Sequence, residues 1–238
     1  MKKRRSIGGY VAFLSVFVIL LVTSVELWAY GVPGFFEKEY EKYQVTADVK
    51  MEMEDLLSVT KEMMSYLRGG RADLHIMTVV DGQSREFFNQ REMAHMEDVR
   101  GLFLGALWLR RLGIVLVIGI LFWFHKNKIP YGKVLPKVFV TGTAVLAALF
   151  LAVGLFAAVD FNACFTAFHK IFFRNDLWLL DPSTDLLINI VPEGFFMDIA
   201  LRIGLTFAGG LGALFAASLF SLVRERKAGK ADSEGKDL

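Results

Sequence analysis

Four long apolar stretches constrain the fold of this chain more than any other feature of its sequence. They cover residues 7–30, 102–124, 134–159 and 195–223. Each is long enough to cross a bilayer, which takes about 20 mostly apolar residues in a helix. With 54% hydrophobic residues, the chain is also more apolar than an ordinary soluble domain. The sequence therefore predicts an α-helical integral membrane protein whose core is a four-transmembrane-helix bundle.

Basic residues outside these stretches set the expected orientation. They gather in residues 2–5, 126–133 and 224–227, and short basic flanks normally remain on the cytoplasmic side of a membrane. Four spans bring all of these regions to the same side. The two other connections, residues 31–100 and 160–194, carry more acidic than basic side chains. The sequence thus predicts a multi-pass protein of the cell membrane, with cytoplasmic N- and C-termini and both acidic connections outside the cell.

This orientation divides the chain into segments. Because the first apolar run is longer than the apolar part of a signal peptide, we expect an uncleaved first helix. The expected transmembrane helices are residues 1–30, 101–124, 134–159 and 195–223. The other segments are the extracellular cap 31–100, the cytoplasmic loop 125–133, the extracellular interfacial loop 160–194 and the cytoplasmic tail 224–238.

The first outer connection is patterned too strongly to be a plain loop. Apolar residues recur at helical spacing over residues 53–67. Farther along, two strand-like runs flank Asp81-Gly82, which is typical of a hairpin with a tight turn. The sequence therefore predicts a small extracellular α/β cap, made of helices plus a short hairpin. Such a cap is too small for a large core of its own, so we expect it to lean on the bilayer or on the second outer loop.

The second outer loop is strongly aromatic. Phe161, Phe165, Phe168 and Phe172 follow a helical spacing and form one apolar face. A helix with such a face lies along a membrane interface, and Trp178 can anchor the segment at the level of the lipid headgroups. The loop is therefore predicted to be interfacial.

His95 is the first candidate for chemistry. Asn89 and Glu92 form a capping box at the start of a helix that is expected to run through His95 into the second span. On this helix Glu92 and Asp98 lie three residues to either side of His95, within reach of its ring. A carboxylate on one ring nitrogen raises the basicity of the other, as a general base requires. The alternative is a solvated histidine on a charged helix.

His169 is the second candidate. It lies on the flank of the phenylalanine face, and Asn162 falls on the same flank two turns earlier. A titratable ring and an amide therefore share the water–lipid boundary. The alternative is a histidine that merely reaches to the interface from its helix.

The sequence lacks the motifs of several classes of protein, and their absence argues against those classes. There is no His-Glu-x-x-His zinc motif, no Gly-x-Ser-x-Gly nucleophile motif and no glycine-rich phosphate loop. No pair of interrupted helices repeats across two halves, which disfavours a secondary transporter. The net charge of +2 gives no sign of nucleic-acid binding. We therefore expect no metal, no cofactor and no nucleic-acid partner.

These motifs together resemble the Lit family, the lipoprotein intramolecular transacylases of Gram-positive bacteria. The resemblance rests on Glu92-x-x-His95-Met96-x-Asp98-Val99 before a span, the segment from Phe161-Asn162 through Phe168-His169 to Trp178, and Pro192-x-x-Phe195-Phe196. It covers essentially the whole chain. The family's two essential histidines would map onto His95 and His169, with Glu92, Asp98 and Asn162 as supporting residues.

The resemblance implies a reaction. Members move the sn-2 acyl chain of a diacylglyceryl-modified lipoprotein onto the α-amino group of its N-terminal cysteine, giving the lyso-form lipoprotein. We expect His95 to be the base, tuned by Glu92 or Asp98, and His169, with Asn162, to steady the oxyanion or the leaving oxygen. The reverse division of labour stays open. The implied protein is an acyltransferase of the bacterial cell membrane, active at its extracellular face. We also expect it to be a monomer. The alternatives are a membrane lipid hydrolase using the same histidines and a non-catalytic receptor or scaffold.

Overall fold

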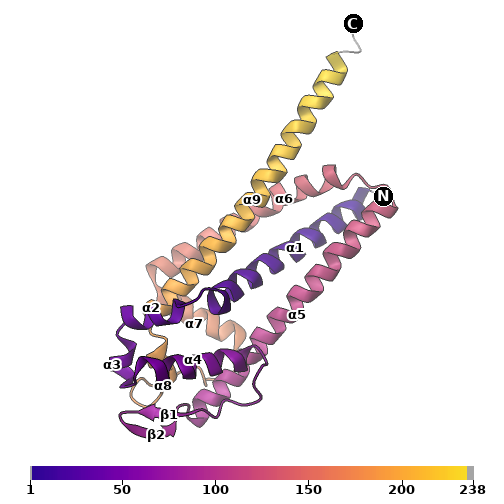
Figure 1. Ribbon diagram of the computed structural model, residues 1–238. Coiled ribbons are helices and arrows are strands. Elements are labelled where there is room, and N and C mark those ends of the chain that lie inside the picture. Colours follow the sequence, from indigo (N-terminus) through magenta and orange to yellow (C-terminus); the bar gives the residue numbers. More distant parts are fainter. Residues whose placement is uncertain (1, 235–238) are drawn as a thin grey trace. The chain divides into compact units, whose positions relative to one another are not determined.

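The computed structural model describes residues 2–234 and is mostly helical (Figure 1). Within these residues, four helices are long and apolar enough to cross a membrane. They are α1 (Lys2–Glu26), which continues into the π-helix η1 (Leu27–Gly31), then α5 (Gln90–Lys126), α6 (Tyr131–Val159) and α9 (Glu193–Glu234). The prediction of a helical membrane protein with four spans is confirmed. Residue 1 of the expected first helix and residues 235–238 of the expected tail lie outside the described residues.

Contacts within the chain divide it into two compact units. The first unit contains most of the length of the four long helices. The second unit contains Val25–Leu107 and Val159–Ile203, the segments between those helices together with the helix ends next to them. His95 and His169 both belong to the second unit.

The first unit leaves most of its apolar side chains on the outside. Phe13 of α1 meets Phe139 of α6 edge to face, with 5.3 Å between ring centroids. Gly142 lies against the Phe13 ring, where any larger side chain would overlap it. Large apolar side chains such as Leu151 and Phe220 are exposed. Helices with apolar residues all round are suited to contact with lipid tails.

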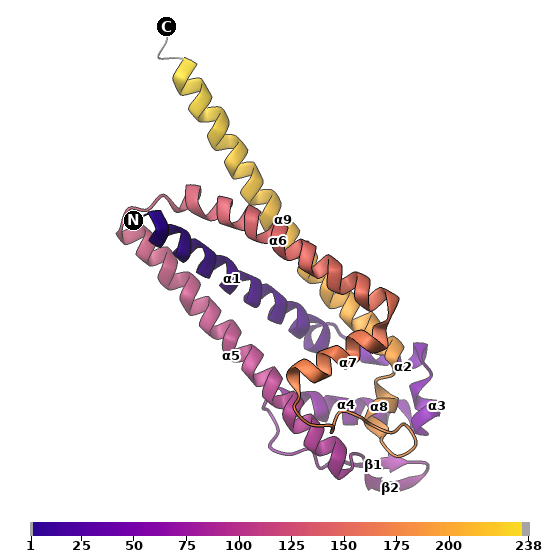
Figure 2. The same cartoon turned by 180° about the vertical axis from the view of Figure 1, so that it is seen from behind.

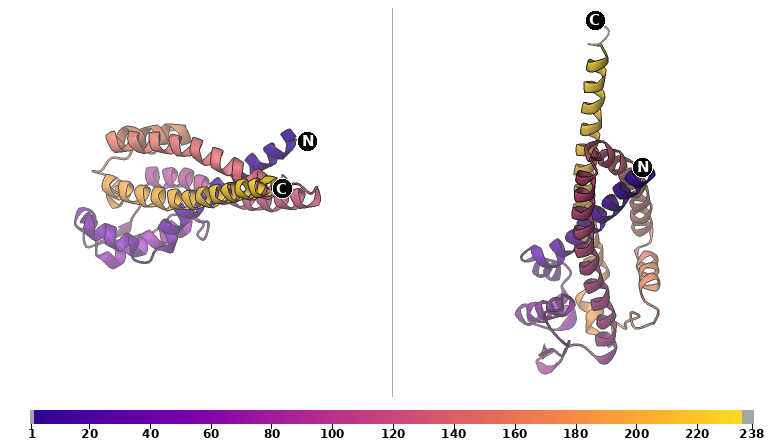
Figure 3. Two further views of the ribbon diagram at one scale, coloured as in Figure 1. Left: turned by 90° about the horizontal axis from the view of Figure 1, so that it is seen from above. Right: turned by 90° about the vertical axis from the view of Figure 1, so that its right-hand side faces the viewer.

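The second unit is built from short elements. They are α2 (Phe35–Lys42), α3 (Val45–Val49), α4 (Met53–Leu67), β1 (Met77–Val80), β2 (Gln83–Glu86), α7 (Phe161–Phe172) and α8 (Leu186–Ile190). The hairpin, α4 and α8 gather near the first turns of α5 in Figure 2. Figure 3 shows the chain in two further views. This unit contains the candidate site.

The hairpin has the turn that its sequence predicts. β1 and β2 pair antiparallel, with Val80 opposite Gln83. Asp81 has a φ of 53° and Gly82 a φ of 73°, and two central residues with positive φ are typical of the tight type I′ turn. The predicted hairpin at this place is confirmed.

The second unit has a buried core shared between its two chain segments. Tyr40, Leu56, Phe87 and Phe88 come from the first segment and are almost fully buried. Leu187, Ile190 and Phe195 of the second segment belong to the same cluster. The cap thus leans on the second outer loop, as expected, and the two segments hold each other in place.

Candidate functional site

The first turn of α5 is fixed by the capping box that the sequence predicts. The Glu92 amide donates a hydrogen bond to Asn89 Oδ1 over 3.0 Å, and the Asn89 amide donates to Glu92 Oε2 over 2.6 Å. Both bonds satisfy amide groups that a helix N-terminus would otherwise leave unpaired. His95 follows one turn later and is 7% exposed.

Helix α7 places the second histidine. Asp160 caps this helix, because its carboxylate accepts a hydrogen bond from the Ala163 amide over 2.9 Å. His169 lies in the last turn and is also 7% exposed. It is therefore buried inside the second unit rather than solvated on the flank of the helix.

The two imidazole rings lie next to each other. Their centroids are 6.0 Å apart, although 74 positions separate the residues in the chain. Phe173 packs against both, with centroid distances of 5.3 Å to His95 and 5.5 Å to His169. Trp178 stacks on His169 at 4.9 Å, with an interplanar angle of 28°. Two titratable rings thus lie buried side by side in one cluster of aromatic side chains.

The hydrogen bond of His169 fixes its tautomer. Nδ1 lies 2.8 Å from the carbonyl oxygen of Phe165, and a carbonyl only accepts hydrogen bonds. Nδ1 therefore carries the proton, which leaves the lone pair of the neutral ring on Nε2. Burial lowers the pKa of His169 below its ordinary value, and the bond to the Phe165 carbonyl opposes this effect. The neutral ring, a base at Nε2, is the favoured form.

The hydrogen-bond environment of His95 favours the other tautomer. Its Nδ1 is buried and has no hydrogen-bond partner among the described residues. A buried N–H without an acceptor is costly, and such orphaned donors are rarer in proteins than unsatisfied acceptors. The tautomer with its proton on Nε2 avoids that cost. In that tautomer the neutral His95 ring would donate a hydrogen bond from Nε2.

Glu92 holds the second outer loop rather than the His95 ring. Glu92 is 1% exposed, and its Oε1 accepts a hydrogen bond from the Leu187 amide over 2.6 Å. With its other oxygen on Asn89, the carboxylate ties the start of α8 to the start of α5. Asn89 adds a bond from Nδ2 to Asp185 Oδ1 at 2.7 Å.

Replacing Glu92 by alanine is expected to destabilise the protein by about 2 kcal/mol, because two buried amides lose a charged acceptor. Glu92→Gln keeps one carbonyl oxygen and should lose less. Thermal unfolding in detergent micelles measures the difference as an apparent Tm. Glu97, exposed on the same helix, provides the matched control Glu97→Ala. Equal Tm values for Glu92→Ala and Glu97→Ala would contradict this role.

Asp98 also joins the two segments. Its Oδ2 accepts a hydrogen bond from Asn175 Nδ2 over 2.8 Å. Nearby, Arg91 donates to the carbonyl oxygen of Asp176. These bonds hold the stretch that follows α7, which contains Phe173 and Trp178, against α5. Asp98 therefore supports the walls of the pocket around His95.

Asn162 lies apart from the histidine pair. Its Oδ1 accepts a hydrogen bond from Thr166 Oγ1 over 3.4 Å, on an exposed part of α7. Among the described residues, no hydrogen bond joins Asn162 to His169. Phe165, Phe168, Phe173 and Trp178 all pack against His169. Of these, Phe173 and Trp178 were not expected as site residues. Trp178, a predicted interface anchor, is only 9% exposed and stacks on the histidine.

The arrangement is suited to acid–base chemistry. It provides a lone pair on one buried ring and an N–H donor on the adjacent one. Within residues 2–234, no three side chains of His, Cys, Asp or Glu lie close enough together to hold a metal ion. The one cysteine of the sequence, Cys164, lies on α7 and is half-buried.

Comparisons with known proteins agree on one family. The family model described as "Lipoprotein intramolecular transacylase Lit" matches residues 10–196. The solved structure of the membrane-integral lipoprotein intramolecular transacylase Lit from Bacillus cereus superposes with a TM-score of 0.74 at 18% identity, over 95% of this chain and 100% of that one. A structure of the Bacillus cereus protein with one histidine changed to arginine gives 0.72 at 19% identity, over 95% and 96%. No curated protein sequence matches this chain.

Proposed function

Because the chain belongs to the lipoprotein intramolecular transacylase (Lit) family, we propose that it converts diacylglyceryl lipoproteins into their lyso form through His95 and His169. The protein is thus an acyltransferase embedded in a membrane. Its substrate is a lipoprotein in the same membrane, and the acyl chain moves from the sn-2 oxygen to the α-amino group of the N-terminal cysteine. The observation that carries the catalytic assignment is the buried pair of rings, 6.0 Å apart.

The hydrogen bonds favour a division of labour opposite to the one expected from the sequence. His169 presents a lone pair at Nε2 because its Nδ1 donates to the Phe165 carbonyl, so His169 is the base. His95 presents an N–H at Nε2 and is the donor to the developing oxyanion. Glu92 and Asp98 act as positioning residues, because they hold the second outer loop against α5.

The proposed acyl transfer needs no covalent bond between the substrate and the enzyme. The amine nitrogen attacks the sn-2 ester carbonyl while His169 Nε2 removes a proton from it. The carbonyl oxygen becomes an oxyanion, which the His95 N–H stabilises. When the tetrahedral intermediate collapses, the bond to the glyceryl oxygen breaks and His169 returns the proton to that oxygen. One amide and one free hydroxyl result, and the enzyme ends as it began.

The substrate supplies both reactants, which lowers the demand on the enzyme. Nucleophile and electrophile belong to one molecule, so the protein gains by holding them in a reactive geometry. Burial of the two rings also strengthens the hydrogen bond to the oxyanion. A histidine pair that moves protons meets these requirements without a covalent nucleophile.

The test uses purified protein in detergent micelles and a synthetic diacylglyceryl lipopeptide. Tandem mass spectrometry should show an unchanged total mass with one acyl group now on the cysteine nitrogen. A membrane lipid hydrolase would instead release free fatty acid and leave the amine unmodified. A receptor or scaffold would leave the lipopeptide intact. Either outcome would overturn the proposed reaction.

The site also predicts a pH dependence. Because burial lowers the His169 pKa in the folded state, the folded protein prefers the neutral ring. The stability that His169 contributes is present at a pH above its pKa in the unfolded chain, about 6.5. This stability is lost as the pH falls toward the lower pKa of His169 in the folded protein. NMR of the ¹⁵N-labelled rings, assigned with His169→Ala, should show His169 titrating below 6.5. Titration at or above 6.5 would contradict the account.

We also propose an orientation in the membrane and an oligomeric state for the enzyme. The basic flanks favour cytoplasmic N- and C-termini in a bacterial cell membrane and a site at the extracellular face. The expected segments, with the cap at 31–100 and the interfacial loop at 160–194, correspond to this orientation. The monomer is proposed as the working unit, since one chain provides both histidines.

A further inference from the structure

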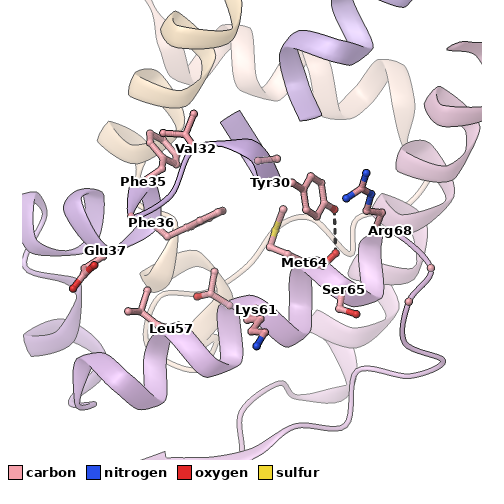
Figure 4. A pocket seen from close by; sticks show the side chains of 15 residues that line it. Tyr30, Val32, Phe35, Phe36, Glu37, Leu57, Lys61, Met64, Ser65 and Arg68 are labelled. Carbon is pink, nitrogen blue, oxygen red and sulfur yellow. Dashed lines mark hydrogen bonds between the residues drawn. The ribbon is translucent and has the colours of Figure 1, made fainter. Parts of the chain in front are cut away.

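A groove with a volume of about 760 Å³ lies in the second unit, away from the histidine pair. It runs between η1 and α2 on one side and α4 on the other (Figure 4). Its lining extends from Ala29 to Gly70 and includes neither His95 nor His169. The reaction described above makes no use of this groove.

The walls of the groove are apolar. Phe36 of α2 faces Leu57 and Met64 of α4, and the buried Phe35 and Ala29 also line the groove. The opening between the walls is held in shape by a hydrogen bond from the Tyr30 hydroxyl to the Met64 carbonyl, 3.0 Å long. Apolar concave surfaces that remain open mark sites where an apolar partner binds.

The groove lies at the end of a membrane span. The first candidate span covers Arg5–Gly31, so Ala29 and Tyr30 are among its last residues. Tyrosine at the end of a span is typical of the headgroup level. Lipid is therefore the apolar material that reaches the groove.

The α4 rim is basic. Lys61, Ser65 and Arg68 line it, and Lys61 forms no ion pair with any described residue. Arg68 pairs with Glu26 at 3.1 Å and covers the Tyr30 ring at 4.9 Å. A second hollow, of about 380 Å³, adjoins the first and shares Lys61 and Ser65 with it.

The acidic side chain that lines the groove, Glu37, lies at the end opposite Arg68. In Figure 4, Glu37 lies at the α2 end of the groove and Arg68 at the opposite end, with Lys61 between them on α4. The groove thus has an apolar trough, and the cationic Lys61 and Arg68 lie on its rim apart from the acidic Glu37. An amphiphile with an anionic head and an aliphatic tail matches both features.

We propose that this groove binds one anionic glycerophospholipid. One acyl chain lies between Phe36, Leu57 and Met64, and the phosphate lies at Lys61 and the Ser65 hydroxyl. The inference is independent of the transacylase reaction, because a membrane phospholipid remains unchanged in this site.

Photo-cross-linking on the full-length protein in detergent micelles tests the proposal. The probe is phosphatidylglycerol with a diazirine in one acyl chain, and phosphatidylcholine with the same chain is its zwitterionic counterpart. We expect phosphatidylglycerol to label the peptide that contains Leu57 and Met64. Unlabelled phosphatidylglycerol should compete with this labelling, whereas inorganic phosphate at the same concentration should not.

Two variants separate the head and tail contacts. Lys61→Glu should reduce phosphatidylglycerol labelling about fivefold or more, the effect expected for one basic residue at an anionic lipid surface. Met64→Trp fills the trough and should reduce labelling by either lipid. The control Arg85→Glu changes an exposed charge on β2 and should leave labelling unchanged. Unchanged thermal unfolding shows that each variant is folded.

Three results would overturn the proposal. The first is equal labelling by the two lipids, and the second is labelling that Lys61→Glu does not reduce. The third is competition by a diacylated lipopeptide at concentrations where phosphatidylglycerol fails, which would make the groove part of the substrate site. Loss of transacylation in any variant leaves this test intact, since labelling needs no reaction.

Discussion

Replacing His169 by alanine is expected to lower the rate of N-acyl transfer by about 100-fold or more, because a positioned acid–base group contributes about 10²–10⁴-fold to a rate. The change removes the lone pair at Nε2 that receives the amine proton. It also removes the ring on which Trp178 stacks. The rate is measured with a diacylglyceryl lipopeptide by following the N-acyl product with mass spectrometry.

The matched control is His75→Ala. His75 is exposed and pairs with Glu86 on the hairpin, so its loss should leave the rate within a factor of two. Folding of both variants is checked by thermal unfolding. A His169→Ala protein that unfolds like the parent and forms product at the parental rate would refute the assignment of His169 as the base.

Glutamine substitutions at the two histidines are expected to have unequal effects. The glutamine amide can donate a hydrogen bond but cannot accept a proton at neutral pH. His95→Gln should therefore retain more activity than His95→Ala, whose loss should be about 10²–10³-fold for a missing oxyanion donor. His169→Gln should be as inactive as His169→Ala. Initial rates of all four variants at one pH provide the comparison.

The opposite pattern would reverse the roles. If His169→Gln retained activity and His95→Gln had none, His95 would be the base and His169 the donor. Equal retention by both glutamine variants would contradict the acid–base division altogether. The measurement therefore decides between the division indicated by the Phe165 hydrogen bond and the one expected from the sequence.

The elements with strong periodicity were predictable from the sequence. The apolar residues of α4 recur at helical spacing, and Asp81-Gly82 has the residue types that a tight hairpin turn requires. The four spans follow from length and hydropathy alone. In each case the local pattern and the final structure agree, so no distant contact had to be known.

Helices α2 and α3 were not predicted, and their size explains why. They have 8 and 5 residues, too few to be stable alone. Tyr40, Val45 and Val49 on these helices are nearly fully buried in the core of the second unit. Long-range packing rather than local pattern therefore determines this part of the fold.

The site was predictable in its main residues but not in its contacts. Topology indicated that His95 and His169 share one membrane face, and the structure places their rings 6.0 Å apart. Local spacing put Glu92 within reach of His95, yet the carboxylate binds the amide of Leu187, which is 95 positions away. Helical spacing cannot reveal a partner on another segment. The same is true of the stacking between Trp178 and His169.

The central claim is that this chain moves an acyl group from oxygen to nitrogen within one lipoprotein. Its most direct test is expression of the full chain in a bacterium that makes only diacylglyceryl lipoproteins, followed by mass spectrometry of a lipoprotein N-terminal peptide. The account predicts an unchanged number of acyl groups, with one on the cysteine nitrogen and a monoacylglyceryl group on the sulfur. Diacylglyceryl peptide with a free amine, from cells in which the protein is present in the membrane, would contradict it.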